Sequence, residues 1–193
     1  MSARMPRREA PNVLLGILRL ARFDAGGLAQ FGTTTQAFLA SLAPLIAFPL
    51  VGAALMLLHG DGLDALAEFL ATLCSLLAPP VLSHLLAAAW RREGDWLRYA
   101  TAFNWCQWVI PMAAAVLLLS AGIMIWAGLP NRIAAFMALA GLILYALVLH
   151  WFIARVGLRL SKLRAVLLVL GVNLGTGALV LLPVLLTLAP KEG

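Results

Sequence analysis

The stretch AAWRREGDWLRY, residues 88–99, places three arginines and two acidic residues between two long apolar runs. The whole chain of 193 residues is 63% hydrophobic and only 11% charged, whereas soluble domains are about half apolar and a quarter charged. A short charged gap between apolar runs is typical of a turn between two membrane helices. The composition therefore predicts a membrane protein, and residues 88–99 are expected to form a cytoplasmic turn within it.

Five apolar segments on either side of such gaps are long enough to cross a membrane, which takes about 20 residues of helix. They cover residues 36–58, 65–90, 99–127, 133–154 and 165–188. Continuous apolar runs without two-residue alternation favour helices over a β-barrel. We therefore expect an all-α membrane protein with five transmembrane helices in one bundle, formed by residues 36–190. One of the threonines at 33–35 is expected to cap the first of these helices.

Lysine and arginine are distributed unevenly among the gaps. Twelve of the fourteen basic residues lie in the N-terminal segment and in the gaps after the second and fourth apolar runs: Arg4, Arg7, Arg8, Arg19, Arg22, Arg91, Arg92, Arg98, Arg155, Arg159, Lys162 and Arg164. The other gaps contain only Arg132 and Lys191. Because basic residues stay on the cytoplasmic side, we expect a bacterial inner-membrane protein with a cytoplasmic N-terminus and a periplasmic C-terminus.

Within the charged stretch, the side chains are expected to meet the lipid head groups. Residues 93–95 are predicted to supply the turn. The arginines and the aromatic residues around the turn are predicted head-group contacts and interfacial anchors: Arg91, Arg92, Arg98, Trp90, Trp96 and Tyr99.

Residues 1–35 are expected to be a cytoplasmic segment with one amphipathic helix over residues 12–23, too short to span a membrane. Leu14, Ile17, Leu18 and Ala21 share one face of that helix. The pattern favours a helix that lies in the inner membrane interface. A cleaved signal peptide with MPRREA as its basic region is the alternative.

Polar residues inside the spans are the first candidates for function in a membrane protein. Four of the predicted helices contribute one layer near the cytoplasmic side, and Gln107 lies one turn deeper; the residues are His84, Asn104, Gln107, His150 and Asn173. Three interpretations are open. The layer is either packing, with interhelical bonds of about 0.6–2 kcal/mol each, or a site for a substrate or a lipid head group. Axial ligation of a b-type haem by His84 and His150 is a third interpretation.

Catalytic and metal-binding motifs give no positive signal. The sequence contains no CxxC, GxSxG, HExxH or glycine-rich phosphate loop. We therefore expect no catalytic activity, no metal and no cofactor, and we expect Cys74 and Cys106 to be free thiols.

Membrane lipids are the expected partners. Positive charge between apolar runs orients helices, so no nucleic-acid partner is expected. Gly171 and Gly175 in GVNLG form a small-residue face that favours close helix contact, either within the chain or with another membrane protein or a second copy.

Three stretches carry a resemblance. The runs FGTTTQAFLASLAPLIAFPL (31–50), RYATAFNW (98–105) and YALVLHWFIARVGL (145–158) with RAVLLVLGVNL (164–174) are similar to a group of uncharacterised bacterial inner-membrane proteins. That resemblance singles out Asn104, Trp105, Tyr145 and Arg155. The five-span arrangement with a cytoplasmic N-terminus also resembles the Yip family, whose members recruit small GTPases or shape membranes.

These features predict a non-enzymatic multi-pass inner-membrane protein with a membrane-organising or complex-associated role. A small transporter or lipid-binding protein that uses the polar layer is the alternative function, and a haem-binding electron carrier is a more distant one.

The charge asymmetry yields a topology prediction. A reporter that is active only outside the cytoplasm should work when fused at Gly62 or after Lys191, and should be inactive at Gly94. Reporter activity in living bacteria measures this directly. Activity of the Gly94 fusion would contradict the predicted orientation.

Overall fold

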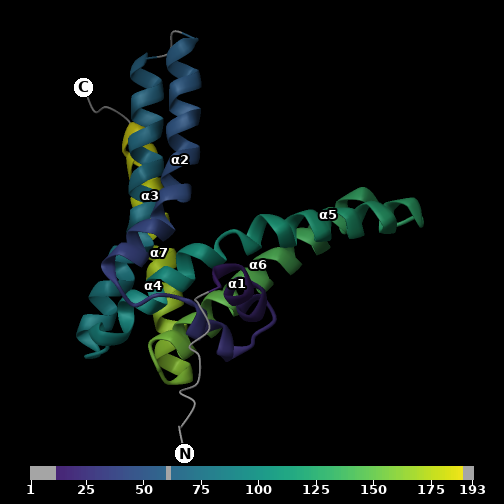
Figure 1. The fold of residues 1–193 in the computed structure, drawn as a ribbon. Helices are drawn as coiled ribbons and strands as arrows, with labels where there is room; N and C mark the ends of the chain where they lie inside the picture. The colour runs from purple at the N-terminus through teal and green to yellow at the C-terminus, as the bar shows by residue number, and fades with distance from the viewer. Residues whose placement is uncertain (1–11, 60–61, 189–193) are drawn as a thin grey trace, which may run out of the picture.

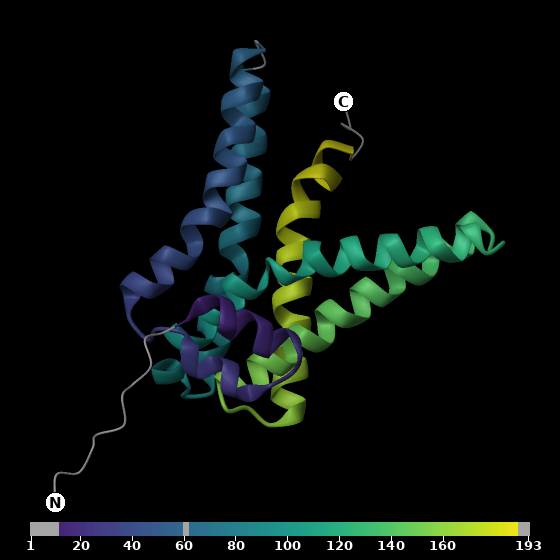
Figure 2. The same ribbon diagram turned by 45° about the vertical axis from the view of Figure 1, so that its right-hand side comes forward.

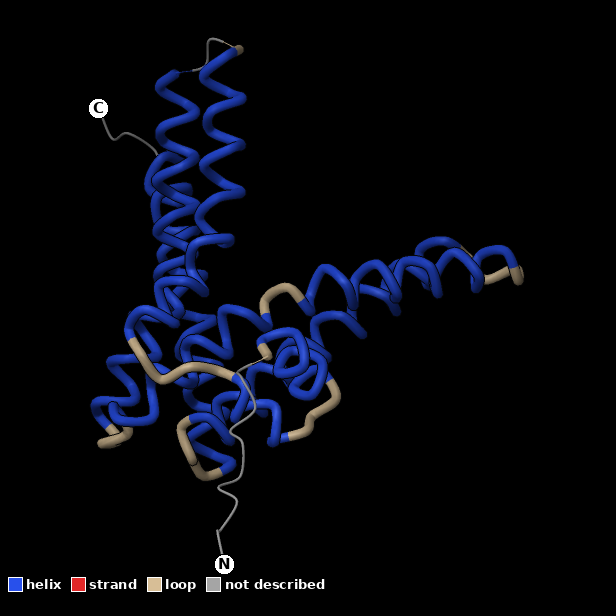
Figure 3. Tube along the Cα trace, in the orientation of Figure 1, coloured by secondary structure: helices blue, strands red, loops and turns tan. Residues whose placement is uncertain are grey.

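The computed structural model describes residues 12–59 and 62–188, and Figure 1 shows their arrangement. Seven α-helices and one 3-10 helix make up this part of the chain, in the order α1 (Val13–Ala21), η1 (Ala25–Gln30), α2 (Thr35–Leu58), α3 (Gly62–Ala89), α4 (Glu93–Cys106), α5 (Val109–Trp126), α6 (Asn131–Gly157) and α7 (Lys162–Leu188). No strand occurs in these two ranges (Figure 3). The predicted all-α class is confirmed. The predicted roles of Arg4, Arg7, Arg8 and Lys191 concern residues outside the described ranges.

Five helical segments of the described chain are long and apolar enough to cross a membrane, as predicted. Thr34 caps the first of them, because its side chain accepts a hydrogen bond from the amide of Ala37. The third segment differs from the continuous helix expected over residues 99–127. It begins at Glu93 and is interrupted after α4, at Gln107 and Trp108.

Proline accounts for the interruption between α4 and α5. Pro111 has no amide hydrogen, so the carbonyl of Gln107 cannot accept the usual bond from the residue four positions later. The amide of Ile110 donates to that carbonyl instead, at 3.2 Å, in the tighter geometry of a turn. Hydropathy alone predicts one continuous helix here, because the apolar character of the segment continues past the proline.

The turn between α3 and α4 lies at residues 90–92, so the prediction that residues 93–95 supply it is wrong. Arg91 takes a positive φ of 57°, and the amide of Arg92 donates to the carbonyl of Ala87 at 2.8 Å. This is the usual way to satisfy the last carbonyls of a helix. Glu93 and Asp95 occupy the first turn of α4, where acidic side chains are favoured by the helix dipole.

Two arms extend from a common base (Figures 1 and 2). One arm is the hairpin of α2 and α3 with α7 packed against α3, and the other is the hairpin of α5 and α6, which points away from the first. Gly171 and Gly175 face the first arm's interior, since a Cβ on either would contact Leu86 or Leu82 of α3. The small-residue face of α7 therefore serves the contact between α7 and α3.

The base contains α4, which packs against α1, α2, α3 and α6. Every residue from 99 to 104 is buried. Tyr99, expected to be an interfacial anchor, is only 2% exposed and lies against Gly157, so that prediction is wrong. The absence of a side chain at Gly157 lets α6 approach Tyr99 closely, which leaves no room for this ring at the surface.

A compact N-terminal unit, α1 with η1, packs on α4 and α6. Nε of Arg19 donates to Asp24 at 2.7 Å, and the amide of Gly26 donates to the other oxygen of that carboxylate at 2.8 Å. These two bonds hold the pKa of the Asp24 carboxyl below its ordinary value. The hydroxyl of Tyr145 donates to the carbonyl of Ala21 at 3.0 Å and so ties the end of α1 to α6.

The predicted helix over residues 12–23 is confirmed, but its apolar face is divided. Ile17 and Ala21 pack against the core, whereas Leu14 is 73% exposed and Leu18 53% exposed. The unit therefore presents leucine side chains outward while its opposite side is held by the protein.

Gly27 provides a test of this packing. A Cβ at Gly27 would lie 2.7 Å from the carbonyl oxygen of Gly16, so Gly27→Ala should loosen α1 from η1. We expect a loss of about 1–3 kcal/mol, typical of overpacking. Faster hydrogen exchange over residues 13–30 and a lower thermal midpoint in detergent would show it. In the control Gly122→Ala, the new Cβ meets no atom within 4 Å. An equal effect of both changes would contradict the role given to Gly27.

Candidate functional site

The five polar residues predicted to form one layer occupy three separate environments. Gln107, His150 and Asn173 line one cavity. Asn104 is buried on another side of α4, where it contacts α2. His84 lies in an apolar groove formed by α2, α3 and α4.

The cavity shared by Gln107, His150 and Asn173 has a volume of about 160 Å³ and lies where α3, α4, α6 and α7 meet. Its walls are the aromatic rings of Tyr99 and Phe103 and the aliphatic side chains of α7. The aliphatic side chains are those of Leu168, Val169 and Val172, and Pro79 and Thr176 complete the lining. This cavity brings together three of the five predicted residues, and we call it the junction cavity.

Two buried polar atoms at the junction cavity lack a hydrogen-bond partner among the described residues. They are Nε2 of His150 and Oγ1 of Thr176. The side-chain amide of Asn173 already has a partner, since its Nδ2 donates a hydrogen bond to the carbonyl of Val169 in the same helix at 2.7 Å. Buried polar groups are normally satisfied. The two free atoms therefore mark the junction cavity as the strongest candidate site.

Asn104 has a packing role in this structure. Its Nδ2 donates to Oγ of Ser41 at 3.0 Å, and the hydroxyl of Ser41 in turn donates to the carbonyl of Phe38. Both Asn104 and Ser41 are almost completely buried. The bond joins α4 to α2 across 63 positions of sequence, as expected for a polar contact between membrane helices.

The ring of His84 packs edge-to-face on Trp96 with centroids 4.6 Å apart, whereas the ring of His150 packs at a tilt on Phe103 at 4.8 Å. Trp96 and Phe103 are seven positions apart on α4, which corresponds to about 10 Å along a helix. The two histidines therefore line different cavities, and this geometry does not provide the paired axial ligands of a b-type haem.

The residues predicted to contact lipid head groups also differ in their exposure. Arg91 and Arg98 are exposed, while Arg92 and Trp90 are partly buried. Trp96 packs inward, because its indole nitrogen donates to Oγ of Ser83 at 3.2 Å. An interfacial anchor would instead direct that nitrogen to the head groups, so Trp96 does not have the predicted position.

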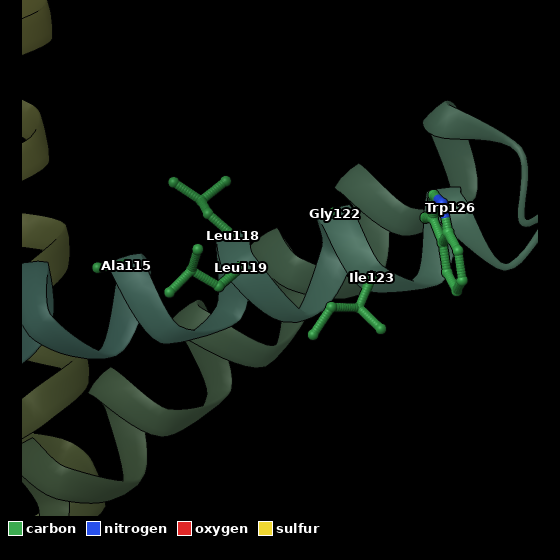
Figure 4. A pocket seen from close by; sticks show the side chains of 6 residues that line it. All are labelled: Ala115, Leu118, Leu119, Gly122, Ile123 and Trp126. Atoms are coloured by element: carbon green, nitrogen blue, oxygen red, sulfur yellow. The ribbon is translucent and has the colours of Figure 1, made fainter.

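A broad, shallow hollow on α5 has a volume of about 650 Å³ but carries little chemistry. Figure 4 shows its leucine and isoleucine side chains pointing outward from α5, with Trp126 at the end of the helix. A surface of this composition is suited to lipid chains. The tryptophan at its end is typical of the membrane interface.

Sequence reasoning missed Thr176 and Ser41. Thr176 lies three positions after Asn173, so helical spacing placed both on the same side of α7 and could have identified it. Ser41 gave no comparable signal, because a single serine in a membrane helix commonly bonds its own backbone.

The contact between α4 and α2 yields a prediction. Asn104→Ala and Ser41→Ala should each lower stability in detergent by about 0.6–2 kcal/mol. The double variant should lose less than the sum of the two, because both changes remove the same bond. Thermal denaturation of the four proteins measures the coupling. Ser120→Ala is the control, since that hydroxyl bonds Val116 of its own helix on an exposed surface. Strict additivity would show that the bond contributes nothing.

Comparison of the chain with known protein families, with curated proteins and with solved structures finds no match in any of the three. The resemblance to the Yip family remains a prediction from the sequence. The architecture is established by the helices themselves. Five apolar helical segments identify an all-α, multi-pass membrane protein.

Proposed function

We propose that this chain is a non-enzymatic component of the bacterial inner membrane, with its N-terminus in the cytoplasm, that organises the bilayer around it. The observation that carries the proposal is the divergence of two apolar arms from one buried base (Figures 1 and 2). A protein of this shape displaces lipid unevenly across the two leaflets, whereas a cylindrical bundle does not.

Helix lengths are compatible with such a shape in a bilayer. The 24 residues of α2 are about 36 Å long and the 27 residues of α6 about 40 Å. Both exceed the ~30 Å hydrocarbon core, and helices longer than the core adapt by tilting. α2 and α6 can therefore cross the same membrane while they tilt in different directions.

The N-terminal unit supports the same role. The exposed Leu14 and Leu18 on α1 can enter the head-group region of the inner leaflet. Exposed basic residues from both turns of the base would hold anionic lipid nearby: Arg91, Arg98, Arg159, Lys162 and Arg164.

Lipid binding, with or without transport, is the second candidate function. The observation that favours it is the pair of unpartnered polar atoms at the junction cavity, on His150 and Thr176. Association with another membrane protein is a further form of the organising role.

The organising role predicts that the protein sorts by membrane curvature. Purified protein with an N-terminal fluorophore, in giant vesicles of phosphatidylethanolamine and phosphatidylglycerol, should be at least about twofold denser on a pulled lipid tube than on the flat membrane. Leu14→Glu should reduce this ratio, because a charged side chain cannot lie in the apolar part of the interface.

Leu63→Glu is the matched control, since Leu63 is 85% exposed at the start of α3, at the far end of the first arm. It should retain the sorting of the unchanged protein. Equal density on tube and flat membrane would contradict the organising role. A stoichiometric protein partner recovered in mild detergent, together with absent sorting, would favour the complex-associated form.

A further inference from the structure

We propose that the junction cavity binds the uncharged, hydrogen-bonding head of a membrane lipid, whose chains lie on the adjoining apolar surface of α7. This inference deepens the second candidate function, lipid binding, and is independent of membrane sorting.

The polar atoms of the cavity provide the recognition. Nε2 of His150 and Oγ1 of Thr176 are buried without a partner in the described ranges. A hydroxyl can donate and accept, and a neutral imidazole nitrogen can do either according to its tautomer. A ligand that carries a hydroxyl or carbonyl oxygen would satisfy both atoms, and the amide of Gln107 on the same wall adds a third hydrogen-bonding group.

Charge selects against a phosphate head. None of the ten residues that line the cavity carries a formal charge when His150 is neutral. A phosphate placed among them would lose its hydration without gaining a counter-charge. The exposed arginines of the base offer such lipids a better position at the head-group level. The cavity therefore suits an uncharged head.

Cavity size determines how much of the ligand enters. Sites that enclose whole small molecules measure about 300–1,000 Å³, whereas this cavity measures about 160 Å³. Only the head fits, so the chains must lie outside. Next to the cavity-lining Val169 and Asn173, the side chains of Leu170 and Leu174 are largely exposed on α7 and offer an apolar path for them.

The aromatic walls are consistent with either of two lipid heads. The rings of Tyr99 and Phe103 line the cavity, and the ring of Phe103 packs at a tilt against His150. A glycerol hydroxyl, as in a diacylglycerol, could bond the polar atoms between these rings. A quinone ring could do so with its carbonyl oxygens while packing on the rings themselves. Both heads share the same chemistry: uncharged, oxygen-bearing and attached to long hydrocarbon chains.

Photolabelling of the full chain tests the proposal. The protein is placed in nanodiscs of phosphatidylethanolamine and phosphatidylglycerol that contain a small fraction of diacylglycerol with a diazirine near its head. The label should appear in peptides that contain residues 99–107 and 169–176. Thr176→Val and His150→Leu should each reduce labelling at least threefold.

Thr101→Val is the matched control. It makes the same change in a buried helical threonine whose hydroxyl is already bonded to the carbonyl of Leu97 at 2.7 Å, away from the cavity. Its labelling should equal that of the unchanged protein. Thermal midpoints of all variants are measured in the same nanodiscs, and labelling is compared only among variants that remain folded. If Thr176→Val or His150→Leu does not fold, Gln107→Leu takes its place.

Competition identifies the source of the head. Unlabelled diacylglycerol or a long-chain quinone should displace the probe, and the stronger competitor is the preferred class. Equal labelling of Thr176→Val and Thr101→Val would overturn the proposal. It would also be overturned if phosphatidic acid displaced the probe as well as the uncharged lipids do. Thr176→Val should sort onto lipid tubes like the unchanged protein, so failure of the cavity proposal and failure of the organising role remain distinguishable.

Discussion

The structure depends on close packing around α4. In lipid, apolar side chains gain little by leaving hydrocarbon for another helix, so association needs close contact and hydrogen bonds. The buried run from residue 99 to 104 provides both. Small side chains at Ala100 and Ala102 permit close approach, Gly157 admits Tyr99, and Asn104 reaches Ser41. α4 contacts both arms, through α2 and α3 on one side and α6 on the other, and α6 also packs directly against α7.

Side-chain hydrogen bonds differ between the base and the arms. In the base, side-chain hydrogen bonds join distant segments, as between Tyr145 and Ala21 or Trp96 and Ser83. In the arms, hydroxyls such as those of Ser75 and Ser120 bond their own helix. The base therefore holds the specific contacts. Of the three unsatisfied buried polar atoms among the described residues, two lie at the junction cavity, and the third is Nε1 of Trp108.

Hydropathy predicted where each span lies, because length and apolarity are properties of a segment taken alone. It predicted the depth of Asn104 and His150 but not the direction in which each faces, since rotation about a helix axis depends on neighbouring helices. Proline at 111 was visible in the sequence, yet its effect at Gln107 depended on local hydrogen bonding. Tyr99 and Trp96 were assigned to the interface from residue type, and packing against Gly157 and Ser83 placed them inside.

The unbroken course of α6 connects the outer arm to the base. α5 is separated from α4 by the interruption at Gln107, whereas α6 runs without a break from the tip of the arm at Asn131 to Gly157 beside Tyr99. His150 lies on this same rigid rod, seven positions before its end. A thinner or thicker bilayer changes the tilt of a long helix. Because His150 is part of α6, any change in the tilt of this helix would move the imidazole relative to the cavity walls formed by α3 and α7.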